Sequence, residues 1–284
     1  MEGHTLALVS FDLDGVLQQN PFQSSRHDGV FGHIKRALAP RVLDAADPEA
    51  AAAIALKLLL DEHQARMHAG RMVEAFDWDG IVAAVAGQLG HPERLDVAAL
   101  VTQYAPRTEL CWLYPGVAEC LQTLTDAGHT LISITNGYRS YQEPVLRQLG
   151  VLAFFKAMVS PEAAGAAKPE PGIFRFAEQF GDAPRIHIGD TLPHDIAGAK
   201  RAGWKAIYIV QPDAPGYTEL PPVLAGLRPW ERPTRGGEWL EHRLERDRLW
   251  HGFPPSEMAE CIPDAIVTAL HEVPAAIAQI AARG

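Results

Sequence analysis

The sequence predicts an α/β protein with a parallel five-stranded core sheet, helices on both faces of that sheet, and a second domain made only of helices. Three observations predict this architecture: a helix–glycine–strand order that recurs between residues 115 and 210, an apolar strand at Leu6–Phe11, and a stretch between them that is rich in Ala and Leu. Helices that alternate with short buried strands are typical of parallel sheets.

The recurring order consists of four helical patterns, at residues 115–128, 141–150, 172–181 and 193–203. Each ends at a glycine, which readily takes the left-handed conformation that follows a helix. A short β-rich run comes after each, at Thr130–Thr135, Ala157–Ser160, Arg185–Ile188 and Lys205–Val210. With Leu6–Phe11, these runs give a five-stranded, Rossmann-like core.

Residues 18–111 interrupt this order and predict a helical cap domain, which leaves residues 1–17 and 112–284 to the core domain. The candidate helices are Val30–Ala37, Pro48–Ala69, Ala75–Leu89 and Asp96–Tyr104. An insertion directly after the first strand is expected to lie over the strand ends, with its two crossings as hinges. Residues 211–284 form a C-terminal extension packed on the core, with expected helices at 238–250 and 263–280.

The composition is that of an ordinary globular protein, with 47% hydrophobic and 21% charged residues. The net charge of −10 argues against nucleic acid or an anionic membrane as the main partner. The first residues do not resemble a signal peptide, and no apolar run is long enough to span a bilayer. We therefore expect a cytoplasmic protein with a small-molecule partner, for which an oligomer is possible but not indicated.

Asp12 and Asp14 stand one residue apart where the first strand ends. Alternate side chains of a strand point to the same side, so the two carboxylates converge. They repel each other unless a cation or a proton lies between them. Such a pair suits a hard metal ion beside a nucleophile and an acid/base group. Gly15 then allows a sharp turn.

Three further signals are expected at the same edge of the sheet, because ligands of open α/β sheets bind beyond the carboxyl ends of the strands. They are Thr135-Asn136 after the second strand, Lys168-Pro169 before a helix, and the segment from Gly189 to Asp195, which holds Asp190 and Asp195. Phosphoryl transfer needs a nucleophile, a cation and donors around the phosphate oxygens. These residue types supply all three.

In this order, the four signals resemble the motifs of the haloacid dehalogenase superfamily, in the phosphatase branch whose helical cap follows the first motif. The resemblance covers Leu6 to about Val210, with residues 18–111 matching the cap in position and helical character. It implies a Mg²⁺-dependent phosphatase that hydrolyses a small phosphorylated metabolite through an aspartyl-phosphate intermediate.

The resemblance also implies a role for each residue. Asp12 would be the nucleophile and a metal ligand, and Asp14 the acid/base group, whose main-chain carbonyl also binds the metal. Lys168 would pair with Asp12 and the phosphate. Thr135 and Asn136 would bind the phosphate, and Asp190 would bind the metal. Asp195 would either orient the metal ligands from behind or only pair with Lys168.

Each assignment has a structural alternative. The aspartate pair could be a solvated strand end, Thr135-Asn136-Gly137 a turn, Lys168 a surface lysine and Asp190 a helix N-cap. His187 and His194 are assigned to structure rather than to catalysis. Candidates for substrate specificity are Gln18, Gln19, Asn20, Arg26, His27, Arg66, Arg71 and Arg139.

Alternative functions follow from the same motifs. A 2-haloacid dehalogenase would have tyrosine at the position of Asp14, because displacement of a halide needs no proton donor. A sugar phosphomutase uses the same aspartate pair and stays open. A catalytically silent phosphate-binding or interaction protein would be expected to lack Asp12, Asp14, Lys168 or Asp190, and the sequence has all four.

Overall fold

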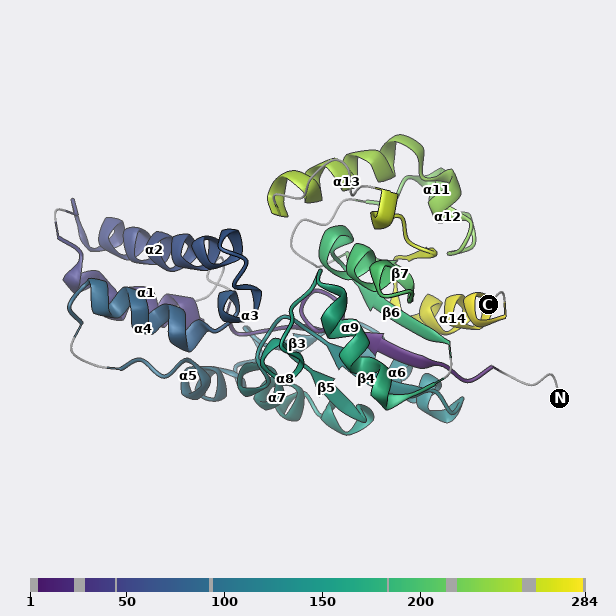
Figure 1. The fold of residues 1–284 in the computed structure, drawn as a ribbon, viewed down its shortest axis with the longest axis horizontal. Helices are drawn as coiled ribbons and strands as arrows, with labels where there is room; N and C mark the ends of the chain where they lie inside the picture. The colour runs from purple at the N-terminus through teal and green to yellow at the C-terminus, as the bar shows by residue number, and fades with distance from the viewer. Residues whose placement is uncertain are drawn as a thin grey trace. The chain divides into compact units, whose positions relative to one another are not determined.

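The computed structural model describes residues 5–22, 29–43, 45–91, 94–182, 184–212, 219–251 and 259–282. The chain divides into two compact units (Figure 1). The sheet unit comprises residues 1–18, 113–135 and 153–284, and the helical unit comprises residues 19–112 and 136–152.

Among the described residues, the sheet unit holds six parallel strands in the order β5-β4-β1-β6-β7-β8. Their bounds are β1 Leu8–Phe11, β4 Thr130–Ile134, β5 Ala157–Val159, β6 Arg185–Gly189, β7 Lys205–Ile209 and β8 Ala265–Val267. Phe11 of β1 pairs in register with Ser133 of β4 and Ile188 of β6, so these three strands end side by side. The predicted α/β class and its parallel sheet are confirmed, with one strand more than the sequence indicated.

The additional strand corrects the expected helix at residues 263–280. Ala265–Val267 forms β8, which pairs with β7 and is fully buried, and α14 begins only at Val273 and ends at Ala281. A short 3₁₀ turn, η6 (Leu270–Glu272), separates them. A short buried strand cannot be distinguished from a buried helical segment by apolar spacing alone, which explains the wrong prediction.

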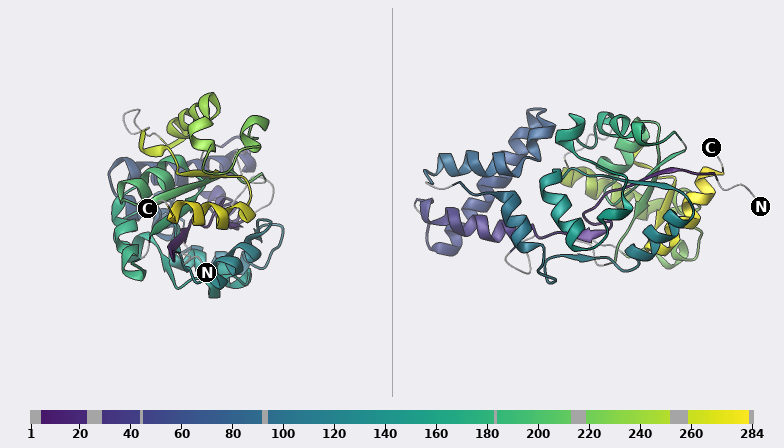
Figure 2. Two further views of the ribbon diagram at one scale, coloured as in Figure 1. Left: turned by 90° about the vertical axis from the view of Figure 1, so that its right-hand side faces the viewer. Right: turned by 90° about the horizontal axis from the view of Figure 1, so that it is seen from below.

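Helices cover both faces of the sheet (Figure 2). On one face α6 (Val117–Asp126) contacts α14. On the other, α9 (Pro171–Ala177) contacts α10 (Gly198–Arg201), and a short π-helix, η4 (Leu192–Ala197), leads into α10. Smaller elements are α8 Pro161–Ala164, α11 Pro222–Ala225, α12 Arg232–Arg235, η2 Leu152–Phe154 and η3 Glu178–Phe180. The charged helix expected near residues 238–250 is α13, Gly237–His251.

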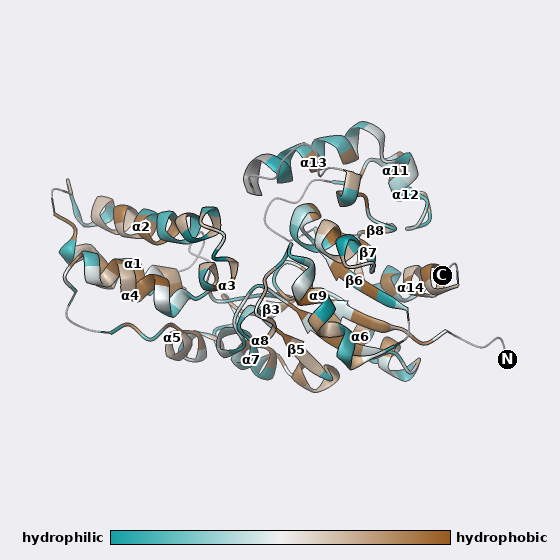
Figure 3. Ribbon diagram, viewed as in Figure 1, coloured by the Kyte–Doolittle hydropathy of each residue, from teal (hydrophilic) through white to brown (hydrophobic). Residues whose placement is uncertain are grey.

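The helical unit contains the helices expected from residues 30–104. They are α1 Val30–Leu38, with the 3₁₀ turn η1 Ala39–Arg41, α2 Pro48–His68, α3 Met72–Ala75, α4 Trp78–Gln88 and α5 Val97–Tyr104. The expected helix at 75–89 begins only at Trp78, because Asp77 caps α4 and accepts a hydrogen bond from the Gly80 amide at 3.0 Å. These helices carry apolar and hydrophilic residues side by side, as helices that cover a core do (Figure 3).

The helical unit also includes α7 (Arg139–Gln148), which the expected domain boundaries assign to the core. Two tyrosines tie this helix to the inserted helices. The Tyr141 hydroxyl donates to Asp79 Oδ2 at 3.0 Å, and the Tyr138 hydroxyl donates to the Val73 carbonyl at 3.1 Å.

The two connecting segments at residues 18–19 and 112–113 pair as a two-stranded sheet, β2 (Gln18–Gln19) with β3 (Trp112–Leu113).

No helix within the described ranges combines the length and the apolar character that crossing a membrane requires.

Candidate active site

The structure brings side chains from three of the four sequence signals into one buried cluster beyond the carboxyl ends of β1 and β6. Asp12 directly follows β1, and its amide donates to the Ile188 carbonyl of β6 at 2.9 Å. Asp190 directly follows β6, and Lys168 lies in the loop between α8 and α9. Thr135, from the remaining signal, follows β4 at the same edge and is 2% exposed.

Lys168 is the centre of the cluster. Its Nζ lies 2.8 Å from Asp12 Oδ1 and 2.5 Å from Asp195 Oδ1, and the residue is only 2% exposed. Burial on its own would lower the pKa of this lysine, but the charges of Asp12 and Asp195 outweigh burial and raise it. Lys168 therefore stays protonated although it is enclosed by protein.

Asp195 is fully buried and accepts four hydrogen bonds. Its Oδ1 accepts from Lys168 and from His187 Nε2, the latter at 3.1 Å. Its Oδ2 accepts from the amide of Thr191 at 2.9 Å and from the hydroxyl of Thr191 at 2.5 Å. Burial would raise the pKa of Asp195, yet Lys168 and His187 hold it far below the usual value. The carboxylate is thus a fixed anion that holds Lys168 in place.

His187 and Ser10 extend this network, and the sequence reasoning assigned neither to the site. They face each other in register on β6 and β1, and Ser10 Oγ lies 2.8 Å from His187 Nδ1. Burial lowers the pKa of His187, so the imidazole is neutral, with Nε2 donating to Asp195 and Nδ1 accepting from Ser10. A sequence signal did exist, because each is a polar residue inside an otherwise apolar strand.

Asp12, Asp190 and Asp195 each place one carboxylate oxygen within 4.8 Å of the others. Burial raises the pKa of Asp12 to about 7, with Asp195 and Asp14 adding to the increase and Lys168 opposing it. Burial and the charges of Asp195 and Asp12 also raise the pKa of Asp190. Three carboxylates around a single lysine charge fit a divalent cation with oxygen ligands, and Asp12 and Asp190 are the residues in position to hold one.

Gly15 allows this close approach. Its φ is +83°, and a Cβ atom at this position would lie 2.1 Å from Asp190 Oδ2. Asp14, the residue before it, is half-buried, and its Oδ1 accepts from Gln18 Nε2 at 3.2 Å. The turn therefore places Asp14 beside Gln18, while its charge is still close enough to raise the pKa of Asp12.

Asn136 is the last of the expected site residues along the second signal. It directly follows Thr135 but begins the second stretch of the helical unit, and it is half-buried. Its expected phosphate contact stays a prediction.

The expected specificity residues differ in their environments. Arg66 is buried and bonds Glu62 and the carbonyls of Glu74 and Gly80, so it joins α2 to α3 and α4 instead of serving as a free cation. Gln18 and Gln19 are buried, and Asn20 accepts from the Phe22 amide. Arg71 is exposed, and Arg26 and His27 lie outside the described residues.

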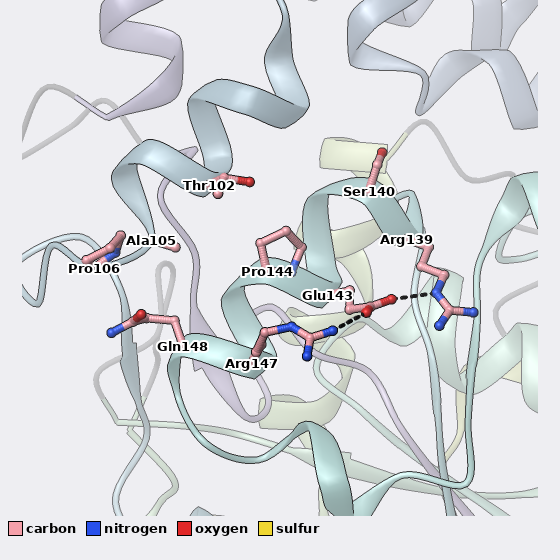
Figure 4. Close-up of a pocket in the computed structure, with 9 residues that line it drawn as sticks. All are labelled: Thr102, Ala105, Pro106, Arg139, Ser140, Glu143, Pro144, Arg147 and Gln148. Atoms are coloured by element: carbon pink, nitrogen blue, oxygen red, sulfur yellow. Dashed lines mark hydrogen bonds and ion pairs between the residues drawn. The ribbon is translucent and has the colours of Figure 1, made fainter.

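Arg139 lines a separate hollow of about 740 Å³ on the helical unit, between α5 and α7 (Figure 4). There Glu143 lies between Arg139 and Arg147 and pairs with both, at 2.6 Å each. Both arginines are exposed, and none of Asp12, Asp14, Thr135, Lys168, Asp190 or Asp195 lines the hollow.

The parallel sheet, the aspartates after adjacent strands and the buried lysine together are the features of an α/β hydrolase. A family model described as haloacid dehalogenase-like hydrolase matches residues 6–203. The chain belongs to this family.

Relatives and solved structures agree with this assignment. The chain is 37% identical over 123 residues to a glyceraldehyde 3-phosphate phosphatase of Methanopyrus kandleri, a match that covers 42% of this chain and 52% of that protein. The matched region thus spans about half the length of that relative. A phosphatase structure of the same family from Thermococcus onnurineus is similar with a TM-score of 0.55 and 23% identity, covering 75% of this chain and 90% of that one.

An L-2-haloacid dehalogenase from Xanthobacter autotrophicus is similar in fold as well, with a TM-score of 0.51 and 19% identity over 96% of this chain and 98% of that one. A phosphatase and a dehalogenase therefore share this fold. The choice between the two reactions rests on the site residues.

Proposed function

We propose that the protein is a Mg²⁺-dependent phosphatase that hydrolyses a small phosphomonoester through an aspartyl-phosphate on Asp12. The observation that carries the proposal is the buried set of Asp12, Lys168, Asp190 and Asp195. It combines a nucleophile, a fixed cation and a carboxylate pair suited to a metal ion. The phosphatase relative from Methanopyrus kandleri supports the same reaction class.

In the first half of the reaction, an Asp12 oxygen attacks phosphorus and the bond to the ester oxygen breaks. Asp14 donates its proton to that leaving oxygen. Lys168 neutralises charge on the phosphoryl oxygens and on Asp12, which it already contacts at 2.8 Å. Thr135, buried at the end of β4, donates to a phosphoryl oxygen.

In the second half, Asp14 takes a proton from water, the water oxygen attacks phosphorus, and inorganic phosphate and free Asp12 result. Asp12, Asp190 and the main-chain carbonyl of Asp14 would hold the Mg²⁺. The ion would supply the positive charge that keeps Asp12 ionised and draws phosphate toward it. Asp195 keeps Lys168 oriented from behind.

The identity of Asp14 favours phosphate esters over haloacids. An alkoxide leaving group needs a proton, and Asp14 sits in a turn where its carboxylate is half-buried and bonded to Gln18.

The test is a panel of phosphomonoesters assayed with Mg²⁺, using the parent, Asp12→Asn and Asp190→Asn. Asp61→Asn, at an exposed aspartate of α2 paired with Lys57, is the matched control. We expect phosphate release by the parent and the control, none by Asp12→Asn, and a loss of Mg²⁺-dependent thermal stabilisation in Asp190→Asn. Equal turnover by the parent and Asp12→Asn would rule out the nucleophile assignment. Turnover of 2-haloacids alone would establish the dehalogenase, and phosphoryl transfer to a second sugar hydroxyl would establish the phosphomutase.

A further inference from the structure

The C-terminal extension, residues 211–284, begins beyond the segment that the family model matches. It nevertheless continues the sheet through β8 and packs α13 against η4. Three side chains of the extension touch the two turns that carry the acidic residues of the site, or the strand behind them.

The first contact is at the turn after β1. Gln211 is 4% exposed, and its Nε2 donates to the Val16 carbonyl at 2.8 Å. Val16 lies two residues after Asp14, in a turn whose own bonds include Gly15 N to Gln18 O at 3.1 Å and Gln18 N to Leu13 O at 3.0 Å. Gln211 thus binds this turn from a segment that lies 195 residues further along the chain.

The second contact is at the turn after β6. Asp247 of α13 is 4% exposed, and its Oδ2 accepts from the Leu192 amide at 3.4 Å. Leu192 is the first residue of η4, where backbone amides have no partner within the helix. Arg246 holds the other oxygen, Asp247 Oδ1, at 2.8 Å. A distant carboxylate thus caps the helix that follows Asp190.

The third contact is one helical turn earlier on α13. Arg243 is 6% exposed, and its Nε donates to the Tyr208 hydroxyl at 2.9 Å. Tyr208 of β7 pairs in register with Gly189, the residue before Asp190. The charge of Asp247 also contributes to the raised pKa of Asp190, so helix α13 passes close to the acidic cluster.

We infer that the C-terminal extension positions the two acidic turns of the active site, with Gln211 holding the Asp14 turn and Asp247 holding the turn after Asp190. Strand pairing fixes the ends of β1 and β6, but the turns beyond them extend past the last ladder bonds. Small displacements of reacting groups cost large factors in rate, so a fixed position of these turns matters for catalysis. The expected effect on kcat rests on the proposed phosphatase function. The expected effect on the position of the two turns is independent of that function.

Two changes in the full-length protein test it. Gln211→Met removes the donor to Val16 with little change of shape, and Asp247→Ala removes the cap of η4. We expect each to lower kcat about 10-fold with KM within about twofold. Asp247→Asn keeps an oxygen that accepts from Leu192, so it should restore most of kcat.

The matched control is Glu272→Gln. Glu272 pairs with the buried Arg232 at 2.7 Å inside the extension and has no described contact with either turn. This change weakens the packing of the extension, so the urea midpoint should fall while kcat stays within about twofold. If Gln211→Met and Asp247→Ala lose stability as Glu272→Gln does but keep kcat, the extension is only a structural addition and the inference fails.

Amide hydrogen exchange provides a readout that needs no substrate. Amides of residues 15–18 should exchange faster in Gln211→Met, and amides of residues 192–196 faster in Asp247→Ala, with neither region changed in Glu272→Gln. Unchanged protection in both variants overturns the inference whether or not any ester is hydrolysed. Inactivity of the parent toward every ester would instead overturn the proposed function.

Discussion

Two halves of the candidate active site, both in the sheet unit, are stabilised in opposite ways. In the half formed by Lys168, Asp195 and His187, the protein supplies a partner for every charge, and Asp195 keeps a very low pKa. In the half formed by Asp12 and Asp190, burial and like charges raise both pKa values. The first half is complete within the protein, whereas the second has an excess of negative charge that a bound cation would relieve.

The largest effect is expected from removing the cation of the complete half. Lys168→Met leaves Asp195 and Asp12 buried without their shared partner, so activity should fall about 10²–10³-fold and the free energy of unfolding by about 3–5 kcal/mol. Kinetics and urea unfolding measure the two losses. The control is Lys205→Met, at a lysine whose side chain is 49% exposed. Equal losses of activity and of unfolding free energy in the two variants would contradict the view that Lys168 neutralises Asp12 and Asp195.

Gly15→Ala tests the crowding of the acidic half. The new Cβ would lie 2.1 Å from Asp190 Oδ2, so Asp190 has to move, and we expect about a 10²-fold loss of kcat with weaker Mg²⁺-induced thermal stabilisation. Gly70→Ala is the matched control, because φ is +71° there and no atom lies within 4 Å of the added Cβ. If Gly15→Ala kept the kinetics of the parent as Gly70→Ala should, the predicted displacement of Asp190 would be wrong.

The pH dependence of stability should differ between the two halves in metal-free protein. The pKa of Asp12 is raised from 3.8 to about 7, so the folded state binds the proton more tightly than the unfolded state. Its contribution to stability is therefore present below pH about 4 and is lost as the pH rises to about 7. Urea unfolding with a chelator should show this decrease, and Asp12→Asn should remove it. A parent that becomes more stable than Asp12→Asn over this range would contradict the raised pKa.

The smallest effect is expected at the far end of the complete half. Ser10→Ala removes the hydroxyl that meets His187 Nδ1 at 2.8 Å, and leaves a buried ring nitrogen without this donor. The free energy of unfolding should fall by about 1–2 kcal/mol, with kcat changed less than about threefold. The nitrogen NMR shifts of His187 should show the proton on Nε2 in the parent. A proton on Nδ1 would mean that the imidazole does not donate to Asp195.

Much of the fold was readable from the sequence because its signals are local. Glycines after helices and short β-rich runs identified five of the strands, and the rule for strand ends put Asp12, Thr135, Lys168 and Asp190 at one edge. The sixth strand was missed because Ile266 and Val267 also fit the apolar spacing of the helix that follows. Its pairing with β7 depends on residues about sixty positions away, which no local pattern encodes.

The site was predictable to the same extent. The residue types required for phosphoryl transfer are visible in the sequence, and pairing of Lys168 with Asp12 or Asp195 was expected, but the more distant partners of these groups are not visible. Ser10 and His187 meet only because β1 and β6 are neighbours in this register, and Asp247 reaches Leu192 only because α13 folds back on η4. Likewise, α7 belongs to the helical unit because the hydroxyls of Tyr138 and Tyr141 bond to the inserted helices, which no local pattern predicts.

The division of the chain has a mechanical consequence. Because the helical unit is built from residues 19–112 and 136–152, the backbone passes between the units at four places instead of two. One of these places lies four residues after Asp14, and another is the peptide bond between Thr135 and Asn136. Any reorientation of the helical unit has to be absorbed by backbone rotation at these points. Asp14 and Thr135, to which the proposed function gives roles in the reaction, therefore lie within four residues of a connection between the units.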